Sequence, residues 1–451
     1  MPLNLKQKQA IRKLLHVRSP KLVYTLEKLH PADIADLFQE LNDREAPELV
    51  NSLVKTGLAG QTLNELPEGI LKNVLELIDD DRLALIIGRL EPDNAVDFLQ
   101  LMEEERKQKI VQKLPASIRK RFQKLLSYEE ESAGALMTPE VFSLPLDATA
   151  QDAIDKIREA GDQLEAIFYL YVVDHSHKLV GVISLRQLIL AQTNTPLKDL
   201  MTPKPVSATV NDDQEHVSSL VTKYDFLSIP VVDDNGVLVG VITVDDVIDV
   251  LEEEATEDFY HMAGISDQER IFTPVSESIK MRIGWVGLNL ITASIAAIIV
   301  GIFENKIAQA AVLATFMPLV AGMGGNSGSQ TLAILVRGIA LGELAFSKIW
   351  QTIFKKAAIG LLLGVFAGGV AAIASYALKA NPWIGLVLFL AMSINMAFGA
   401  LIGTIVPIIL KALNKDPALG SGILVTALTD SIGYILLFSI SLAFWGHIQG
   451  M

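Results

Sequence analysis

The sequence predicts a multidomain protein with an acidic α-helical superhelical N-terminal domain, a tandem pair of α/β domains, a linker helix and an all-α membrane domain of five helices. Three observations predict this architecture. A chain of 451 residues is long for one domain. A segment of about 115 residues contains an internal duplication. Residues 1–277 carry 28 Lys and Arg against 48 Asp and Glu, a net charge of −20, whereas the apolar residues 278–451 carry ten against four, a net charge of +6.

Residues 1–130 are predicted to form the acidic helical domain, because apolar residues recur there at spacings of three and four. The fragments LHPADIADLFQEL and LEPDNAVDFLQLM repeat one helical unit 61 residues apart, which is typical of a helical superhelix. The N-terminus is amphipathic and lacks the apolar run of a secretory signal, so this domain is expected in the cytoplasm. Its acidity disfavours nucleic acid as a partner and favours cations, although an acidic surface also simply maintains solubility.

The duplication lies within residues 137–251, where LVGVI recurs 59 residues apart. Each copy combines β-branched strands with helices, which predicts one α/β domain over 131–200 and a second over 201–251. The pair resembles tandem CBS domains, a regulatory fold that binds adenosine ligands or ions in the cleft between its copies. Residues 252–280 are then predicted to be a helical linker to the membrane domain. That linker either transmits motion or is an inert spacer.

Five apolar segments of membrane-spanning length are predicted within residues 281–451. Pro318 and a glycine cluster predict a break or kink in the second segment. Basic residues are concentrated in the loops on one side, and an odd number of spans places the N-terminus in the cytoplasm and the short C-terminus outside. The segments are about 283–303, 307–336, 357–378, 383–410 and 418–446.

Asp430 is the most informative residue of the apolar half, because it is the only Asp, Glu, Lys, Arg or His in the fifth segment. A charge there costs on the order of 3 kcal/mol to insert, so it is expected to face water or a partner. The centres of the other four segments contain no Lys, Arg or His. Asp430 is therefore predicted to bind a cation, the alternative being a protonated carboxyl that joins two helices.

The run from Pro318 to Gln330, PLVAGMGGNSGSQ, offers glycines for close packing or unwinding and neutral oxygen donors. Oxygen donors without sulfur or imidazole favour a hard cation. The alternative is a small-residue packing surface between helices.

A CBS pair followed by five spans, with PLVAGMGGNSGSQ in the second and ALTDSIG in the last, resembles the MgtE family of magnesium channels. The resemblance covers essentially the whole chain. It implies a homodimer in the plasma membrane (the inner membrane of a bacterium) whose pore is lined by the second and fifth helices and closed by the helix near 252–272. Ser329 stands where some members have asparagine. The pore ion-binding residues that we infer are Gly325, Asn326, Ser329, Thr426 and Asp430.

A regulatory Mg2+ surface is predicted where acidic side chains gather on the N-terminal domain, the second CBS copy and the linker. Like charges repel unless cations bridge them, so cytoplasmic Mg2+ is expected to compact this assembly and close the pore. The predicted residues are Asp93, Asp97, Asp213, Glu215, Asp225, Asp246, Asp249, Glu254, Glu257 and Asp258.

Adenine nucleotide, including ATP, is a weaker candidate ligand. The second copy contains Gly240, Thr243 and Asp246 in a G-x-x-[S/T]-x-x-D pattern, whereas the first has Gln187 in place of the acid. Candidate nucleotide contacts are Tyr169, Arg186 and Phe226.

No nucleophile–base set, P-loop or histidine cluster suggests an enzyme, so a transporter or channel is predicted. Two alternatives stay open: an ion-coupled secondary transporter of other divalent cations, and a membrane ion sensor that does not conduct. The sequence does not separate Mg2+ from Mn2+, Co2+ or Ca2+.

Overall fold

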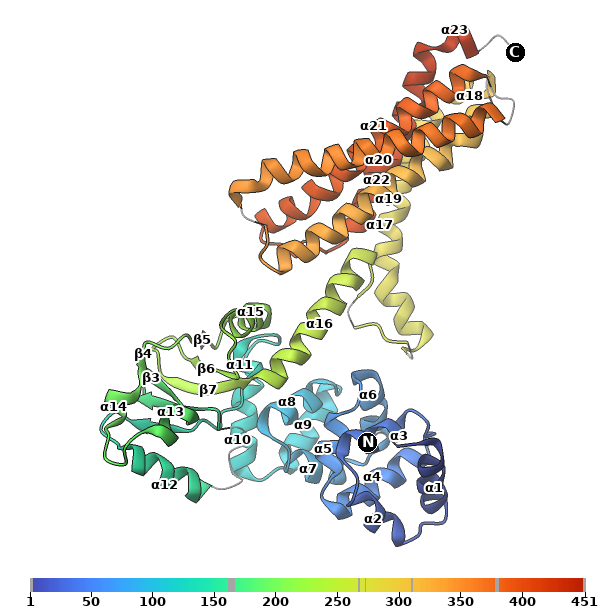
Figure 1. Cartoon of the computed structure of the whole chain (residues 1–451). Helices are drawn as coiled ribbons and strands as arrows, with labels where there is room; N and C mark the ends of the chain where they lie inside the picture. Colours follow the sequence, from blue (N-terminus) through green and yellow to red (C-terminus); the bar gives the residue numbers. More distant parts are fainter. Residues whose placement is uncertain are drawn as a thin grey trace. The chain divides into compact units, whose positions relative to one another are not determined.

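The computed structural model describes residues 3–160, 167–266, 268–271, 273–309, 311–344, 346–377 and 381–448. The chain divides into two compact units, Met1–Glu252 and Glu253–Met451. The first unit contains the helical domain and the α/β pair, and the second contains the apolar helices (Figure 1).

The N-terminal domain is entirely helical over its described residues and encloses one large apolar core. The repeated fragments form α3 and α8, and each helix begins with a proline at its first position. The helices are α1 (Leu5–His16), α2 (Lys21–Leu26), α3 (Pro31–Phe38), α4 (Glu45–Thr56), α5 (Ala59–Asn64), α6 (Glu68–Leu77), α7 (Asp80–Ile87), α8 (Pro92–Gln100), α9 (Glu104–Lys113) and α10 (Ala116–Leu125).

Two similar α/β domains follow, which confirms the duplication. The first has a sheet of order β1-β2-β3-β4 and the second a sheet of order β5-β6-β7, with β1 and β5 parallel to their neighbours and the β2–β3 and β6–β7 pairs antiparallel. The strands are β1 (Ser143–Pro145), β2 (Tyr169–Val173), β3 (Leu179–Ser184), β4 (Thr202–Pro203), β5 (Ala208–Thr209), β6 (Ser228–Val232) and β7 (Leu238–Thr243). The helices are α11 (Ala133–Leu136), α12 (Ala150–Ala160), α13 (Leu185–Leu190), α14 (Leu197–Leu200) and α15 (Gln214–Tyr224).

The glycine of each LVGVI motif has the same packing role. Gly181 lies against the Met201 side chain, and Gly240 lies against Met137, so that a methyl group at either position would overlap the methionine sulfur. The helical domain joins the second copy through a shared core, in which Val96 of α8 packs with Val247 and Ile229.

The linker differs from the prediction. Its helix, α16 (Val244–Ala263), begins within the second CBS copy and ends nine residues before position 272. The described residues between Ala263 and Val275 are not helical. They are tied to the next helix by a bidentate ion pair, in which Arg282 Nε donates to Glu269 Oε2 at 2.8 Å. The prediction of a helix over about 252–272 is therefore wrong at its C-terminal end, which lies at Ala263.

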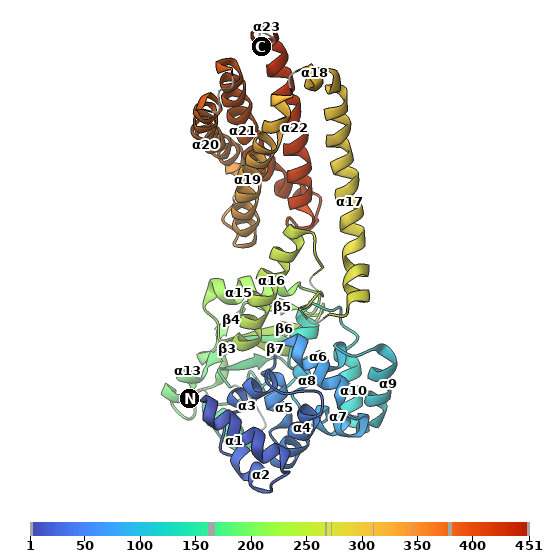
Figure 2. The ribbon, with the colours of Figure 1, turned by 90° about the vertical axis from the view of Figure 1, so that its right-hand side faces the viewer.

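Four described helices are long and apolar enough to cross a membrane (Figures 1 and 2). They are α17 (Val275–Ile302), α20 (Ile349–Ala377), α21 (Pro382–Ala412) and α22 (Ser421–Ala443). The second predicted span is α19 (Val312–Ala340), whose 29 residues span about 43 Å but include the polar run GGNSGSQ. Short pieces flank these helices: α18 (Glu304–Gln309), η2 (Phe346–Lys348) and α23 (Trp445–Ile448).

Helix α19 is continuous through Pro318 and the glycine cluster, so the predicted break is absent and no carbonyls are freed by unwinding. Instead, the glycines allow close helix packing. Gly324 and Gly328 of α19 meet Gly399 and Gly403 of α21 with backbone against backbone.

Candidate ion path and regulatory sites

Asp430 lies near the middle of α22 and is half-buried within the single chain. Thr426, one helical turn earlier, is exposed, whereas Thr429 beside Asp430 is fully buried and donates to the Val425 carbonyl at 2.9 Å. Among the described residues, none forms a hydrogen bond or an ion pair with the Asp430 carboxylate. Asp430 therefore lies on a helix face that the single chain does not fully cover.

The polar run of α19 has two faces with different roles. Gly324, Ser327 and Gly328 are buried, and Ser327 donates to the Met396 carbonyl at 2.9 Å. Asn326 and Ser329 are exposed on another face of the same helix. The buried residues therefore form the packing surface that was the alternative interpretation, whereas ion binding by the exposed Asn326 and Ser329 stays a prediction.

Helices α19 and α22 pack against each other at the level of the predicted pore residues. A methyl group at Gly325 would lie 3.7 Å from Thr429 Oγ1, and one at Gly328 would overlap Val425. The structure therefore brings Gly325 of α19 next to the turn of α22 that carries Asp430.

Asn395 of α21 is a buried polar residue that the sequence reasoning missed. Its Nδ2 donates to the Val320 carbonyl of α19 at 2.9 Å, and its amide also lies beside Gly324 and Gly433. An uncharged amide in an otherwise apolar span was the available signal. Asn395 thus links α21 to both helices that carry predicted pore residues.

Asp93, which is buried, and Asp246, which is half-buried, form an acidic pair of the first unit. Asp93, on α8, is 7% exposed. Burial, followed by the nearby charge of Asp246, raises the pKa of Asp93 to about 7. Burial also raises the pKa of Asp246 to about 6, although the Thr243 hydroxyl opposes this by donating to Asp246 Oδ2 at 2.6 Å. Two carboxyl groups from different domains thus lie close enough for the charge of one to act on the other.

Asp249 extends this group along α16. It is exposed, and partial desolvation, followed by the charges of Asp245 and Glu252, raises its pKa. Asp97, one turn after Asp93 on α8, is also exposed. Among the ten predicted regulatory residues, Asp93 and Asp246 are two whose charges act on each other from different domains.

The other predicted residues of the first unit have local structural roles or exposed positions. Asp213 caps α15 by accepting from the Glu215 backbone N–H at 2.8 Å, and both side chains are exposed. Asp225 ends α15 in the left-handed conformation, with φ of 53°. Glu254, Glu257 and Asp258 lie on α16 in the second unit and are half-buried.

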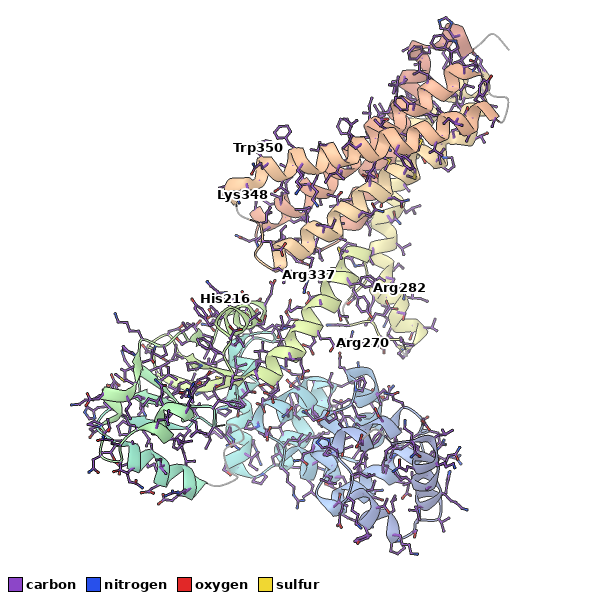
Figure 3. The ribbon with its side chains drawn as sticks, in the orientation of Figure 1. His216, Arg270, Arg282, Arg337, Lys348 and Trp350 are labelled. Atoms are coloured by element: carbon purple, nitrogen blue, oxygen red, sulfur yellow. The ribbon has the colours of Figure 1, made fainter. Side chains whose placement is uncertain are left out.

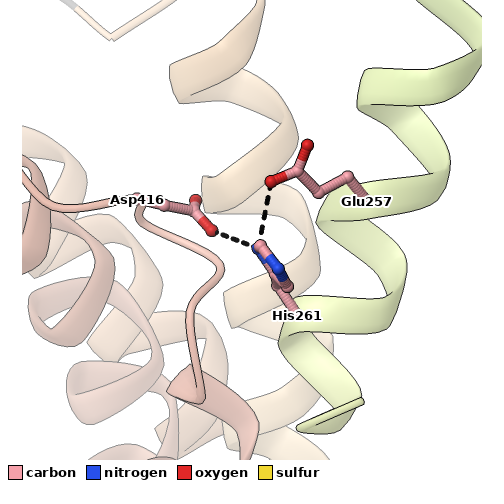
Figure 4. Close-up of side chains that lie close together, drawn as sticks. All are labelled: Glu257, His261 and Asp416. Carbon is pink, nitrogen blue, oxygen red and sulfur yellow. Dashed lines mark hydrogen bonds and ion pairs between the residues drawn. The ribbon is translucent and has the colours of Figure 1, made fainter. Parts of the chain in front are cut away.

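Glu257 belongs to a second cluster, with His261 and Asp416, that the sequence reasoning did not identify (Figure 4). His261 Nδ1 lies 2.7 Å from Asp416 Oδ2 and 3.4 Å from Glu257 Oε1. The spacing of Glu257 and His261 at i and i+4 on a predicted helix was a signal, but nothing in the sequence connected them with Asp416.

The fold brings only two of the three candidate nucleotide-binding residues close to each other. The Tyr169 hydroxyl accepts from the Leu227 backbone N–H at 3.5 Å, which places Tyr169 beside the chain that carries Phe226. Arg186 is exposed on α13. The Thr243–Asp246 pattern caps α16, and Ser184 and Gln187 form a capping box on α13, so this motif has a structural role in both copies.

Comparison with known proteins shows the family. A model described as a divalent cation transporter matches residues 317–440, the MgtE intracellular N domain matches 29–131, and CBS domains match 133–194 and 197–253. A magnesium transporter MgtE of Bacillus subtilis is 34% identical over 93% of this chain and 93% of its own length. The chain belongs to the MgtE family. An MgtE of Thermus thermophilus is 33% identical over 92% of this chain and 93% of its own length.

Solved structures agree with this membership. The cytosolic domain of the Mg2+ channel MgtE in complex with ATP has 34% sequence identity and a TM-score of 0.51, and it covers 54% of this chain and 99% of that one. MgtE relatives are named as transporters. An inosine-5'-monophosphate dehydrogenase of Nitrosopumilus maritimus matches only 26% of this chain and 23% of the enzyme, so that match implies no enzymatic activity here.

Proposed function

We propose that this protein is a Mg2+ channel of the plasma membrane that works as a homodimer and is closed by cytoplasmic Mg2+. The observation that carries the proposal is the position of Asp430, which lies half-buried in an apolar helix beside the turn of α19 that contains Gly325. Relatives that match over more than nine-tenths of the chain are named as magnesium transporters.

The chemistry of the proposed path suits a hydrated divalent ion. Mg2+ gives up its water reluctantly, so a site that holds it through water needs charge and oxygen atoms at some distance from the ion. Asp430 supplies the charge, and Asn326, Ser329 and Thr426 supply neutral oxygen atoms on exposed helix faces. Two such faces across a symmetry axis place two carboxylates around one doubly charged ion.

The basic residues support a cytoplasmic N-terminal half. Arg282, Arg337 and Lys348 lie toward the same end of the apolar helices, as Figure 3 shows. An excess of Lys and Arg marks the cytoplasmic side of a membrane protein. The acidic first unit, which continues directly into α16, is then placed in the same compartment.

The gating proposal rests on the acidic pair of Asp93 and Asp246. Asp93 and Asp246 repel each other when both are ionised, and burial increases this cost. Mg2+ between them offsets the repulsion and favours the state in which α8 contacts the start of α16. Because α16 continues toward the membrane helices, an ion that favours this contact also biases the helix that closes the pore.

The test is Mg2+ flux into proteoliposomes that contain the wild type, Asp430→Asn or the surface control Asp199→Asn. Flux that follows voltage and concentration, and that disappears only in Asp430→Asn, supports a channel with its path at Asp430. Flux that requires a pH gradient supports the coupled transporter. Absence of divalent flux in folded wild type at low cytoplasmic Mg2+ overturns the proposal in favour of a sensor.

ATP is a second candidate ligand, because a related cytosolic domain has been solved with ATP and Tyr169 lies beside the segment that carries Phe226. We propose that ATP binds between the CBS copies and alters the Mg2+ sensitivity of gating. Flux is measured against cytoplasmic Mg2+ with and without ATP, for the wild type and Tyr169→Ala. Identical curves for the wild type in both conditions exclude this role.

A further inference from the structure

Three lysines lie at or just before the beginning of α20. Lys348 ends η2, and Lys355 and Lys356 belong to the second turn of the helix. Lys348 and Lys355 are exposed, and Lys356 is half-buried. Among the described residues, no carboxylate forms an ion pair with any of these ammonium groups, and Glu343 is the only acidic residue between positions 331 and 415. These charges are therefore available to an anion from outside the chain.

The length of α20 places these lysines in the headgroup layer of a membrane. The helix has 29 residues and is about 43 Å long, whereas the hydrocarbon core of a bilayer is about 30 Å thick. Residues 357–377 contain no charged side chain and span about 31 Å, so they fill that core. The turns before them then lie among lipid headgroups, at the end of the apolar helices that also carries Arg337 (Figure 3). This is the end that we place on the cytoplasmic side.

Two aromatic side chains lie beside the lysines on the surface of α20. Trp350 is 72% exposed and Phe354 is 70% exposed, and their ring centroids lie 6.5 Å apart. Tryptophan is enriched at the boundary between headgroups and acyl chains, because its ring is apolar and its N–H group needs a polar partner. The exposed side chains of Leu362 and Phe366 continue the apolar surface toward the middle of the helix. Helix α20 thus presents cations next to an apolar surface, as a phospholipid presents its phosphate next to its acyl chains.

We propose that the beginning of α20 binds one anionic phospholipid, such as phosphatidylglycerol. Lys348 and Lys355 are seven positions apart, about two helical turns, and their long side chains extend toward one headgroup. The phosphate lies between the two ammonium groups, and an acyl chain lies along Trp350 and Phe354. Phosphatidylcholine carries a cation beside its phosphate and has no net charge, so the lysines prefer the anionic lipid.

The bound lipid stabilises the packing of α20 and does not depend on ion conduction. The turns that follow the lysines pack on the backbone of α21 through Gly360 and Gly364. A lipid held at the preceding turns restrains this end of α20 against α21. Phosphatidylglycerol is therefore expected to raise the unfolding temperature of the full-length protein in detergent by more than phosphatidylcholine does.

The binding experiment adds phosphatidylglycerol or phosphatidylcholine to the purified full-length protein in detergent and counts the retained lipids by native mass spectrometry. We expect the wild type to retain one phosphatidylglycerol per chain in preference to phosphatidylcholine. One lysine near an anionic lipid changes binding by about fivefold, so the double variant Lys348→Gln, Lys355→Gln is expected to bind at least ~10-fold more weakly. The matched control is Lys411→Gln, Lys415→Gln, which removes two exposed lysines at and just after the end of α21 and is expected to bind as the wild type does.

A fluorescence measurement locates the lipid on the helix. Brominated acyl chains quench an indole that they contact. Brominated phosphatidylglycerol is expected to quench the wild type more than brominated phosphatidylcholine does, and this excess is expected to disappear in Trp350→Phe. An excess that persists in Trp350→Phe overturns the assigned position of the acyl chain.

Four outcomes of the binding experiment overturn the site. The wild type retains both lipids equally, or its preference is unchanged in Lys348→Gln, Lys355→Gln. The control Lys411→Gln, Lys415→Gln loses the lipid to the same extent, which indicates diffuse surface charge, or soluble glycerol phosphate displaces the lipid, which indicates a site for a free anion. A protein that binds phosphatidylglycerol as expected but conducts no Mg2+ overturns the channel function and leaves this site in place.

Discussion

At the scale of single residues, the surroundings of Asp93 raise the pKa of its carboxyl group. Asp93 is buried on α8, and the charge of Asp246 acts on it. Desolvation disfavours the charged form of a carboxyl group, and a like charge adds to this effect. Asp93 is therefore the acidic residue whose protonation is most closely coupled to the stability of the first unit.

The pKa of Asp93 predicts a pH dependence of stability. A carboxyl whose pKa is raised in the folded protein contributes stability that is full below its ordinary pKa of ~4 and is lost as the pH rises through about 7. Without divalent ions, the wild type is therefore expected to unfold at a lower temperature at about pH 8 than at about pH 5.5. Asp93→Asn removes the buried charge and flattens this dependence, by about 2 kcal/mol between these two pH values.

Thermal unfolding of the full-length protein at both pH values checks this expectation, with Asp43→Asn as an exposed control on the same domain. Mg2+ favours the ionised pair, so its stabilising effect on the wild type is expected to be larger at the higher pH. An Asp93→Asn variant with the same pH dependence as the wild type contradicts the assignment.

At the scale of elements, the membrane helices are positioned by glycine and small polar residues. Gly360, Gly364 and Gly368 of α20 pack against the backbone of α21, and α19 packs on α21 through Gly324 and Gly328. In lipid, the hydrophobic effect does not drive helices together, so close packing and buried hydrogen bonds must hold them. Helix α21, with Asn395 at its centre, thus supports the helix that carries Asn326.

A methyl group tests this packing directly. Gly399→Ala would place a carbon atom into the Gly324 carbonyl oxygen, so the helices must separate, at a cost of about 1–3 kcal/mol or more. The control is Gly322→Ala on α19, the helix that Gly399 contacts. A methyl group at Gly322 would have no atom within 4 Å, so this variant is expected to be neutral or slightly stabilising. The thermal stability of the two purified variants is measured in detergent. Equal stability argues against the close approach of α19 and α21 at Gly399.

Asn395 provides a second test at this scale. Asn395→Leu removes the donor to the Val320 carbonyl and adds bulk beside Gly324 and Gly433. We expect lower stability and reduced Mg2+ flux, because the two helices that we propose line the pore are displaced. Asn395→Asp keeps the shape but loses the donor, and a variant with unchanged flux would show that the amide does not position the path.

At the scale of the whole molecule, charge separates the two halves of the chain. The first 277 residues carry a net charge of −20, and the remaining residues carry +6. Such an acidic region concentrates cations near itself, and its self-repulsion falls when they bind. This gives the protein a means of responding to the concentration of the ion that we propose it conducts.

The gating proposal predicts a shift in Mg2+ sensitivity. The double variant Asp93→Asn, Asp246→Asn removes both the repulsion between the two carboxylates and the proposed ion site. Closure of the pore then no longer depends on Mg2+ bound between these two residues. We expect the cytoplasmic Mg2+ concentration that halves flux to change by at least several-fold, while conduction through Asp430 persists. Flux measured at stepped internal Mg2+ tests this, with Asp43→Asn as the control, and an unchanged curve would assign gating to other residues.

The sequence by itself determined the order of the domains, the duplication, the apolar helices and the family, because these depend on periodicity, repeats and composition along the chain. It also singled out Asp430, since a charge within an apolar segment is visible without a fold. Only the tertiary structure decided which acidic residues meet: Asp93 reaches Asp246 because α8 shares a core with the second CBS copy. Only packing divided the glycine-rich run into a buried face and an exposed face. The contact of His261 with Asp416, across 155 positions of the chain, had no local signal, because such proximity arises only when helices pack.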